Sequence, residues 1–145
     1  MSHDPFGNLE DWGKVLVTLK ELTERGQLDD AQDGIARLVR YPDNWRLRES
    51  ALVAARQVKE PTSALLNAIA HVLEDRGTFV DARILAARAL GDLAVRKSQK
   101  DATPAATRKA LRATLQRQLE SPEAPVLTRA IEAALKKIDQ SRASA

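Results

Sequence analysis

Apolar residues recur along the chain at intervals of three and four positions, the spacing that gives an α-helix one apolar face. Seven segments carry this pattern, and no segment shows the alternation with period two that is typical of a half-buried β-strand. The pattern therefore predicts an all-α protein. The expected helices span about 9–25, 28–40, 44–58, 62–75, 79–95, 104–120 and 126–138.

Capping and turn residues separate these segments. Asn8 is the expected N-cap of the first helix, and Gly26 is expected to end it. Residues 41–44 (YPDN) and 121–125 (SPEAP) are predicted as turns, and residues 96–103 (RKSQKDAT) as a polar loop. The expected apolar stripe of the first helix consists of Leu9, Trp12, Leu16, Leu19 and Leu22.

The predicted helices form pairs that resemble one another. A shift of 35 positions aligns residues 46–58 with 81–93 and places Arg48 on Arg83, and a further shift of 45 positions reaches residues 126–138. A repeated helical hairpin of this length is typical of an α-solenoid, because each hairpin buries its apolar faces by stacking on its neighbours. We therefore expect a single domain that forms a short right-handed α-solenoid of antiparallel helix hairpins. Its expected parts are an N-terminal cap helix at 9–25, three pairs over 28–138, and flexible tails at 1–7 and 139–145.

The stretch DARILAARALGDL, residues 81–93, resembles the motif of the HEAT-repeat family, in which V-R-x-x-A precedes A-L-G-x-L on the second helix of each pair. The matching positions are Arg83, Ala86, Leu90, Gly91 and Leu93. Residues 47–58 give a second match, and in the third pair Thr128 stands in place of the arginine. The resemblance implies that the motif arginines pair with turn aspartates, for which Asp43 and Asp75 are the candidates.

The two arginines of the predicted helix 79–95 point to different sides of it. Arg83 is expected between repeats, bonded to carboxylate or helix-end carbonyl oxygens, and Arg88 on the inner, solvent-facing surface of the solenoid. Solenoid faces of this kind commonly bind partners, so we expect this surface to bind another protein or a peptide; an ordinary solvated face is the alternative. The predicted partner-binding residues are Arg46, Val53, Arg56, Asp81, Leu85, Arg88, Asp92, Arg129 and Lys137.

Positive charge is concentrated in one later part of the chain. Residues 96–118 carry seven basic side chains against one acidic side chain, a net charge of +6. Such a stretch can also bind nucleic acid, because several Lys and Arg side chains along one phosphate backbone give salt-dependent affinity. The candidate nucleic-acid-binding residues are Arg96, Lys97, Lys100, Arg108, Lys109 and Arg112.

The chain offers few groups for catalysis. It contains no Cys and only two His, His3 and His71, which excludes cysteine nucleophiles and His/Cys metal clusters. We expect no enzymatic activity, no metal, no cofactor and no small-molecule substrate. No apolar run approaches the roughly 20 residues of a membrane span, and the N-terminus does not resemble a signal peptide. These features favour a cytoplasmic protein that does not bind membranes.

The predicted function is a non-catalytic protein–protein interaction module, either an adaptor or a subunit of a larger assembly. It would bind its partner through the face formed by the second helices of the repeats. Nucleic-acid binding through residues 96–118 is the alternative, and a purely structural fragment or designed chain is a third interpretation.

Overall fold

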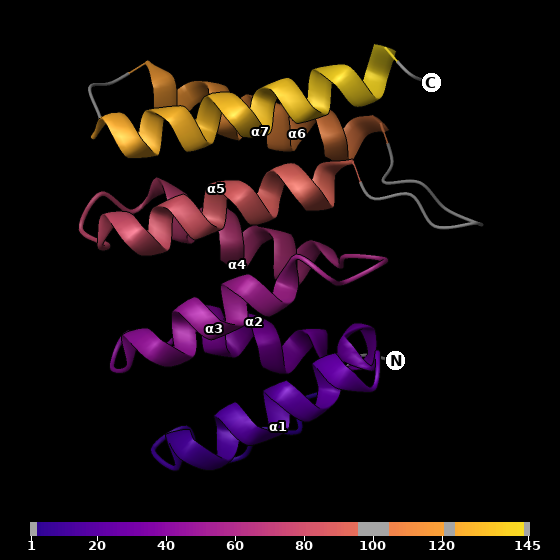
Figure 1. Ribbon diagram of the computed structural model, residues 1–145, viewed down its shortest axis with the longest axis vertical. Helices are drawn as coiled ribbons and strands as arrows, with labels where there is room; N and C mark the ends of the chain where they lie inside the picture. The colour runs from indigo at the N-terminus through magenta and orange to yellow at the C-terminus, as the bar shows by residue number, and fades with distance from the viewer. Residues whose placement is uncertain (1–2, 96–104, 121–123, 144–145) are drawn as a thin grey trace.

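The fold consists of helices stacked in two layers (Figure 1). The computed structural model describes residues 3–95, 105–120 and 124–143, and these residues contain no β-strand. The all-α prediction is therefore confirmed. The helices are α1 (Trp12–Glu24), the 3-10 helix η1 (Leu28–Ala31), α2 (Gln32–Arg40), α3 (Trp45–Ala55), α4 (Ser63–Glu74), α5 (Val80–Ala94), α6 (Ala105–Leu119) and α7 (Pro125–Ala143).

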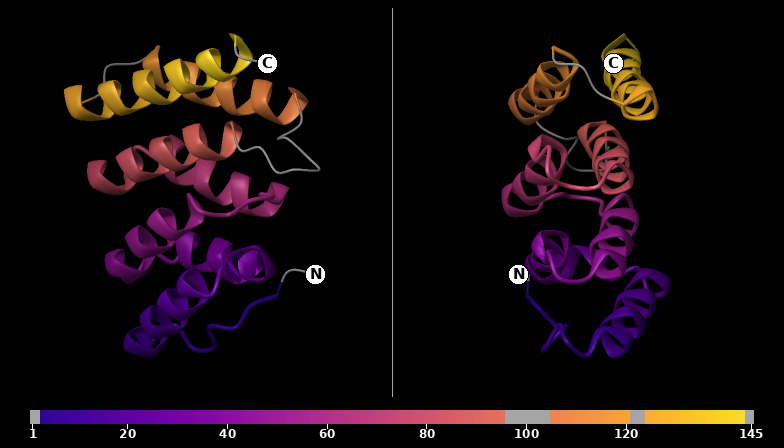
Figure 2. Two further views of the ribbon diagram at one scale, coloured as in Figure 1. Left: turned by 45° about the vertical axis from the view of Figure 1, so that its right-hand side comes forward. Right: turned by 90° about the vertical axis from the view of Figure 1, so that its left-hand side faces the viewer.

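The right-hand view of Figure 2 separates the two layers. Helices α1, α3, α5 and α7 pack on one another in that order and form what we call the odd layer. Helices α2, α4 and α6 form the even layer, and the pairs α2–α3, α4–α5 and α6–α7 join the layers. This packing order is the one expected for consecutive helix hairpins that stack on one another. The right-handed superhelix and the HEAT-like character of the pairs stay predictions.

The core lies between the layers and is almost entirely aliphatic. Its central helix is α5, which packs on α3, α4, α6 and α7. Ala86, Ala87 and Ala89 are fully buried there, as expected for a helix that neighbours cover on both sides. A Cβ atom added at Gly91 would lie 2.8 Å from the Cβ of Ala134. Small residues therefore let α5 and α7 approach closely.

The first helix begins later than expected, so the prediction of a helix from residue 9 with Asn8 as its N-cap was wrong. The side chain of Asn8 accepts a hydrogen bond from the N–H of Glu10 in a turn, and Asp11 precedes the helix. Trp12 was also wrongly placed in the buried stripe, because it is 44% exposed at the first position of an end helix that only α3 covers in the odd layer. Gly26 has φ +66° and ends the region as predicted.

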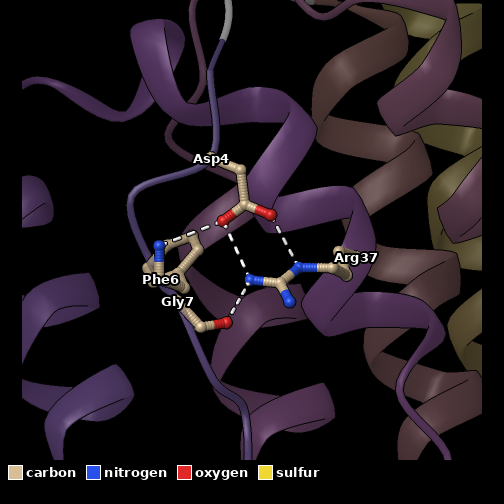
Figure 3. A network of polar contacts seen from close by, with 4 residues as sticks. All are labelled: Asp4, Phe6, Gly7 and Arg37. Atoms are coloured by element: carbon tan, nitrogen blue, oxygen red, sulfur yellow. Dashed lines mark hydrogen bonds and ion pairs between the residues drawn. The ribbon is translucent and has the colours of Figure 1, made fainter.

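Residues 3–7, expected as a flexible tail, instead pack under α2 (Figures 2 and 3). Phe6 is buried, and its ring would be only 2.6 Å from a Cβ at Gly34, so glycine is needed there. The carboxylate of Asp4 accepts hydrogen bonds from the N–H of Phe6 (3.0 Å) and from Arg37, with an Nε–Oδ2 distance of 2.6 Å. Arg37 also donates to the carbonyl oxygen of Gly7 at 2.8 Å. This segment closes the lower end of the even layer.

The other boundaries are close to those predicted, with two exceptions. The predicted helix 28–40 starts as a 3-10 turn, and the predicted helix 126–138 runs from Pro125 to Ala143, so residues 139–143 are not the expected tail. Pro125 suits a first helical position because the N–H that it lacks is not needed there. The predicted loop 96–103 and most of the predicted turn 121–125 lie outside the described residues.

Candidate functional site

The two arginines of α5 occupy the different environments expected of them. Arg83 is 3% exposed, and its Nε donates to the carbonyl oxygen of Leu73, in the last turn of α4, at 2.8 Å. Its Nη2 lies 3.4 Å from the amide oxygen of Gln118 in α6. The prediction of a bond to a helix-end carbonyl oxygen is confirmed. Arg88 is exposed on the odd layer, so its predicted exposure to solvent is confirmed, and its assignment to the inner surface of a solenoid stays a prediction.

The equivalent arginine of the preceding pair, Arg48, is held differently. Its buried Nε has no hydrogen-bond partner in the part of the chain that the structure describes. Hydrogen bonds from the N–H of Gly77 and the hydroxyl of Thr78 lower the pKa of Asp75, and the positive charge of Arg48 adds to this effect. Asp75 thus interacts with Arg48 through charge, and the hydrogen-bonded Arg–Asp pair that the HEAT resemblance implies is not formed between these two described residues.

A hollow of about 620 Å³ opens on the odd layer between α5 and α7. We call it the cationic hollow, because four cationic and two acidic side chains line it, a net of two positive charges. Gly91 and three alanines of α7 form small apolar positions between the charges. The charged lining residues, all predicted from the sequence, are Arg56, Asp81, Arg88, Asp92, Arg129 and Lys137.

Asp92 links three elements across this hollow. Its carboxylate accepts a hydrogen bond from Nε of Arg56, just after α3, at 2.5 Å, and another from Lys137 of α7. Burial by itself would raise the pKa of Asp92, but the hydrogen bonds and positive charges of Lys137 and Arg56 outweigh burial and lower it. This bridge fixes the spacing of the hollow's walls and engages two of its four cations.

The other two cations of the hollow are not engaged. Arg88 and Arg129 are both exposed and make no ion pair or side-chain hydrogen bond with any part of the chain that the structure describes. Each guanidinium carries a fork of N–H donors that matches a carboxylate in geometry. The hollow can therefore accept anionic groups without first breaking an internal pair.

A second hollow of about 510 Å³ lies on the same layer between α1 and α3. Val53 of α3 and Leu85 of α5, both predicted partner-binding residues, line it. Glu49, which also lines it, has a raised pKa because of burial and, second, because of the negative charge of Asp81. A small acidic region thus lies close to both hollows.

Arg46 lies outside both hollows and contacts two tryptophans. Its guanidinium carbon lies 5.9 Å from the ring centre of Trp12 and 5.4 Å from that of Trp45, within the range of a cation–π interaction. Both rings are largely exposed, Trp45 to 57%. The sequence analysis predicted Arg46 as a binding residue but did not predict the two exposed rings. Their position was the available signal, because the first residue of a helix need not face the core.

Large exposed apolar side chains are restricted to the odd layer. Within the described residues they all belong to odd-numbered helices or, for Phe79, to the N-cap of α5. They are Trp12, Val17, Trp45, Val53, Phe79, Val80 and Val126. The even layer has no counterpart in that part of the chain, so the two faces of the molecule differ in kind.

The structure describes only some of the candidate nucleic-acid-binding residues, because Arg96, Lys97 and Lys100 lie outside the described residues. Arg108, Lys109 and Arg112 line a hollow of about 660 Å³ on α6. Arg112 forms a two-bond ion pair with Asp139 (2.9 and 3.3 Å), which raises the pKa of Arg112. Part of the positive charge of α6 is thereby neutralised.

The described residues contain no group of three or more His, Cys, Asp or Glu side chains placed to hold a metal ion. His71 is exposed on α4. Among the described helices, none combines the length and apolarity needed to cross a bilayer. No protein-family model, curated protein or solved structure matches the chain.

Proposed function

We propose that the chain is a non-catalytic, HEAT-like protein-interaction module that binds a partner protein or peptide through the outer face of the odd layer. It would act in the cytoplasm as an adaptor or as a subunit of a larger assembly. The observation that carries the proposal is the segregation of exposed large apolar side chains to this layer. Soluble proteins rarely gather such side chains on one face unless that face contacts another molecule.

Two further features support the proposal. The cationic hollow is lined by small apolar positions and by two arginines, Arg88 and Arg129, that have no internal partner within the described residues, a combination that provides both contact area and directional hydrogen bonds. The walls of the cationic hollow are held by the bridge through Asp92, so the surface is preformed. A preformed surface loses little conformational entropy on binding.

The test is affinity capture followed by mass spectrometry with three forms of the chain. Wild type should capture a reproducible partner, and the double charge reversal Arg46→Glu/Arg88→Glu should lose it. The control Arg108→Glu/Lys109→Glu changes the net charge equally but lies on the even layer, so it should retain capture. Equal capture by wild type and the Arg46/Arg88 variant would exclude this face as the site.

Nucleic-acid binding through residues 96–118 is the second candidate. The hollow on α6 supports it, because Lys109 is exposed and Arg108 is half-exposed beside it. A fluorescent DNA duplex should then bind at low salt, with affinity that falls steeply as salt rises. Arg108→Glu/Lys109→Glu should weaken that binding, and Arg46→Glu/Arg88→Glu should not. No binding at low salt would remove this candidate.

A further inference from the structure

The exposed apolar side chains of the odd layer are concentrated where its helices begin. Trp12 and Trp45 are the first residues of α1 and α3, Phe79 and Val80 are the N-cap and first residue of α5, and Val126 is the second residue of α7. In Figure 1 the odd-numbered helices begin on the left, so these residues lie along one side of the layer. We call this row of five residues the apolar edge.

The apolar edge runs into the cationic hollow. Val126 belongs to both, because it is half-exposed at the start of α7 and lines the hollow between α5 and α7. Beyond it the hollow contains Arg88 and Arg129, which have no internal partner within the described residues. At the other end of the edge, Arg46 lies against the two tryptophan rings and has no carboxylate partner among the residues that the structure describes. Unneutralised cations therefore accompany the apolar row at both ends.

We propose that the partner segment is an acidic peptide with bulky apolar side chains, which runs across the odd layer rather than along one helix. Its apolar side chains pack on the apolar edge, and its carboxylates pair with Arg88 and Arg129 in the hollow. Charge complementarity carries this assignment, because the hollow has a net positive charge and its two free guanidinium groups offer paired donors. The inference rests on the proposed function and adds the chemistry of the partner.

The chain contains a built-in reporter for this surface. Its only two tryptophans, Trp12 and Trp45, both belong to the apolar edge. A ligand that covers the edge removes these rings from water and should shift the tryptophan emission to shorter wavelength. A ligand that binds at α6 should leave the emission unchanged.

The experiment uses the full chain and a phage-displayed library of random peptides of about 12 residues, a length that can span several helices when extended. Enriched peptides are synthesised without tryptophan and titrated by the change in emission. The proposal expects enrichment of Glu or Asp together with Leu, Ile or Phe. Replacing each Glu or Asp of a selected peptide by Gln or Asn should weaken binding about tenfold or more.

Variants of the chain locate the binding. Arg88→Glu/Arg129→Glu should weaken the selected peptides at least about tenfold, and Arg108→Glu/Lys109→Glu, with the same charge change, should leave the affinity within about twofold. Circular dichroism verifies that each variant is folded. Arg88→Gln/Arg129→Gln, which removes the charges without reversing them, should give an intermediate loss.

The outcomes separate this inference from the proposed function. Peptides that shift the tryptophan emission but show neither acidic enrichment nor sensitivity to Arg88 and Arg129 would overturn the acidic-partner proposal and leave the binding face intact. Selected peptides that bind without changing the emission and without sensitivity to any odd-layer variant, or a library that yields no binder, would overturn both. Preference for a DNA duplex over every peptide would favour the second candidate function.

Discussion

Replacement of Arg83 tests whether a buried arginine holds the helix pairs together. Its guanidinium connects α5 to the end of α4 and to α6, and its methylene stem is buried in the same position. Arg88 is on the same helix five positions later but is exposed. Arg83→Ala, Arg83→Met and Arg88→Ala therefore form a matched set in which burial is the main variable.

The expected loss follows from the contacts. A hydrogen bond from a charged donor to a carbonyl contributes about 1.5–3 kcal/mol, and the longer contact to Gln118 adds little. Truncation to Ala also removes two buried methylenes, about 0.8 kcal/mol each. Relief of the guanidinium's desolvation offsets part of the sum. We expect Arg83→Ala to lower the free energy of unfolding by about 3 kcal/mol and Arg83→Met, which keeps an apolar stem, by about 2 kcal/mol.

Urea denaturation followed by circular dichroism at the helical band measures these losses. Arg88→Ala should change the free energy of unfolding by less than about 0.5 kcal/mol, as expected for an exposed position. The slope of the transition should stay the same in all three variants, so that the midpoints report stability. If Arg83→Ala and Arg88→Ala lower stability equally, the buried arginine does not hold the pairs together and the reasoning fails.

Three further predictions concern the packing and the charges. Gly91→Ala should destabilise the fold by about 1–3 kcal/mol in thermal unfolding, because the new Cβ would lie 2.8 Å from a side chain of α7. Gly13→Ala should instead stabilise the fold by about 0.5–1 kcal/mol, because no atom lies within 4 Å of the new Cβ. Phe6→Ala should cost about 3 kcal/mol in urea unfolding, while Phe79→Ala, at a ring that is 77% exposed, should cost less than about 0.5 kcal/mol. The pKa of Asp92 is lowered in the folded state, so the ionised carboxylate stabilises the fold. Wild type should therefore be more stable than Asp92→Asn above the unfolded pKa of about 3.9, and this difference should disappear as pH falls through the folded pKa. Urea titrations at neutral and acidic pH measure the difference. An advantage that grew on acidification would contradict the assigned bridge.

The sequence predicted well which side chains share the exposed face of the odd layer, because the phase of a helix is fixed. At 100° per residue, exposure at one position determines which side chains three, four and seven residues away are exposed. The repeat alignment then transferred this face from α5 to α3 and α7. Of the nine predicted partner-binding residues, six line the cationic hollow, Val53 and Leu85 line the second hollow, and Arg46 lies beside the tryptophans.

The features that were not predicted depend on contacts between distant parts of the chain. Nothing in the local pattern of residues 3–7 indicates that Asp4 pairs with Arg37, 33 positions later, or that Phe6 fits above Gly34. The exposure of Trp12 likewise depends on what lies beyond the end helix of the stack. Periodicity gives the orientation of a side chain relative to its own helix, but tertiary packing decides whether a neighbour covers it.

The distribution of aromatic side chains argues independently of charge against an ordinary solvated face. The chain has five aromatic residues, and three of them, Trp12, Trp45 and Phe79, are exposed on the apolar edge. Phe6 is the aromatic residue within the buried core, which is otherwise aliphatic, and Tyr41 packs at its margin. Polar side chains are expected on a face that only contacts water, because exposed rings contribute little to folding and favour aggregation. Aromatic rings are instead enriched where proteins bind one another, so their position on the odd layer supports the proposal that a partner covers this edge.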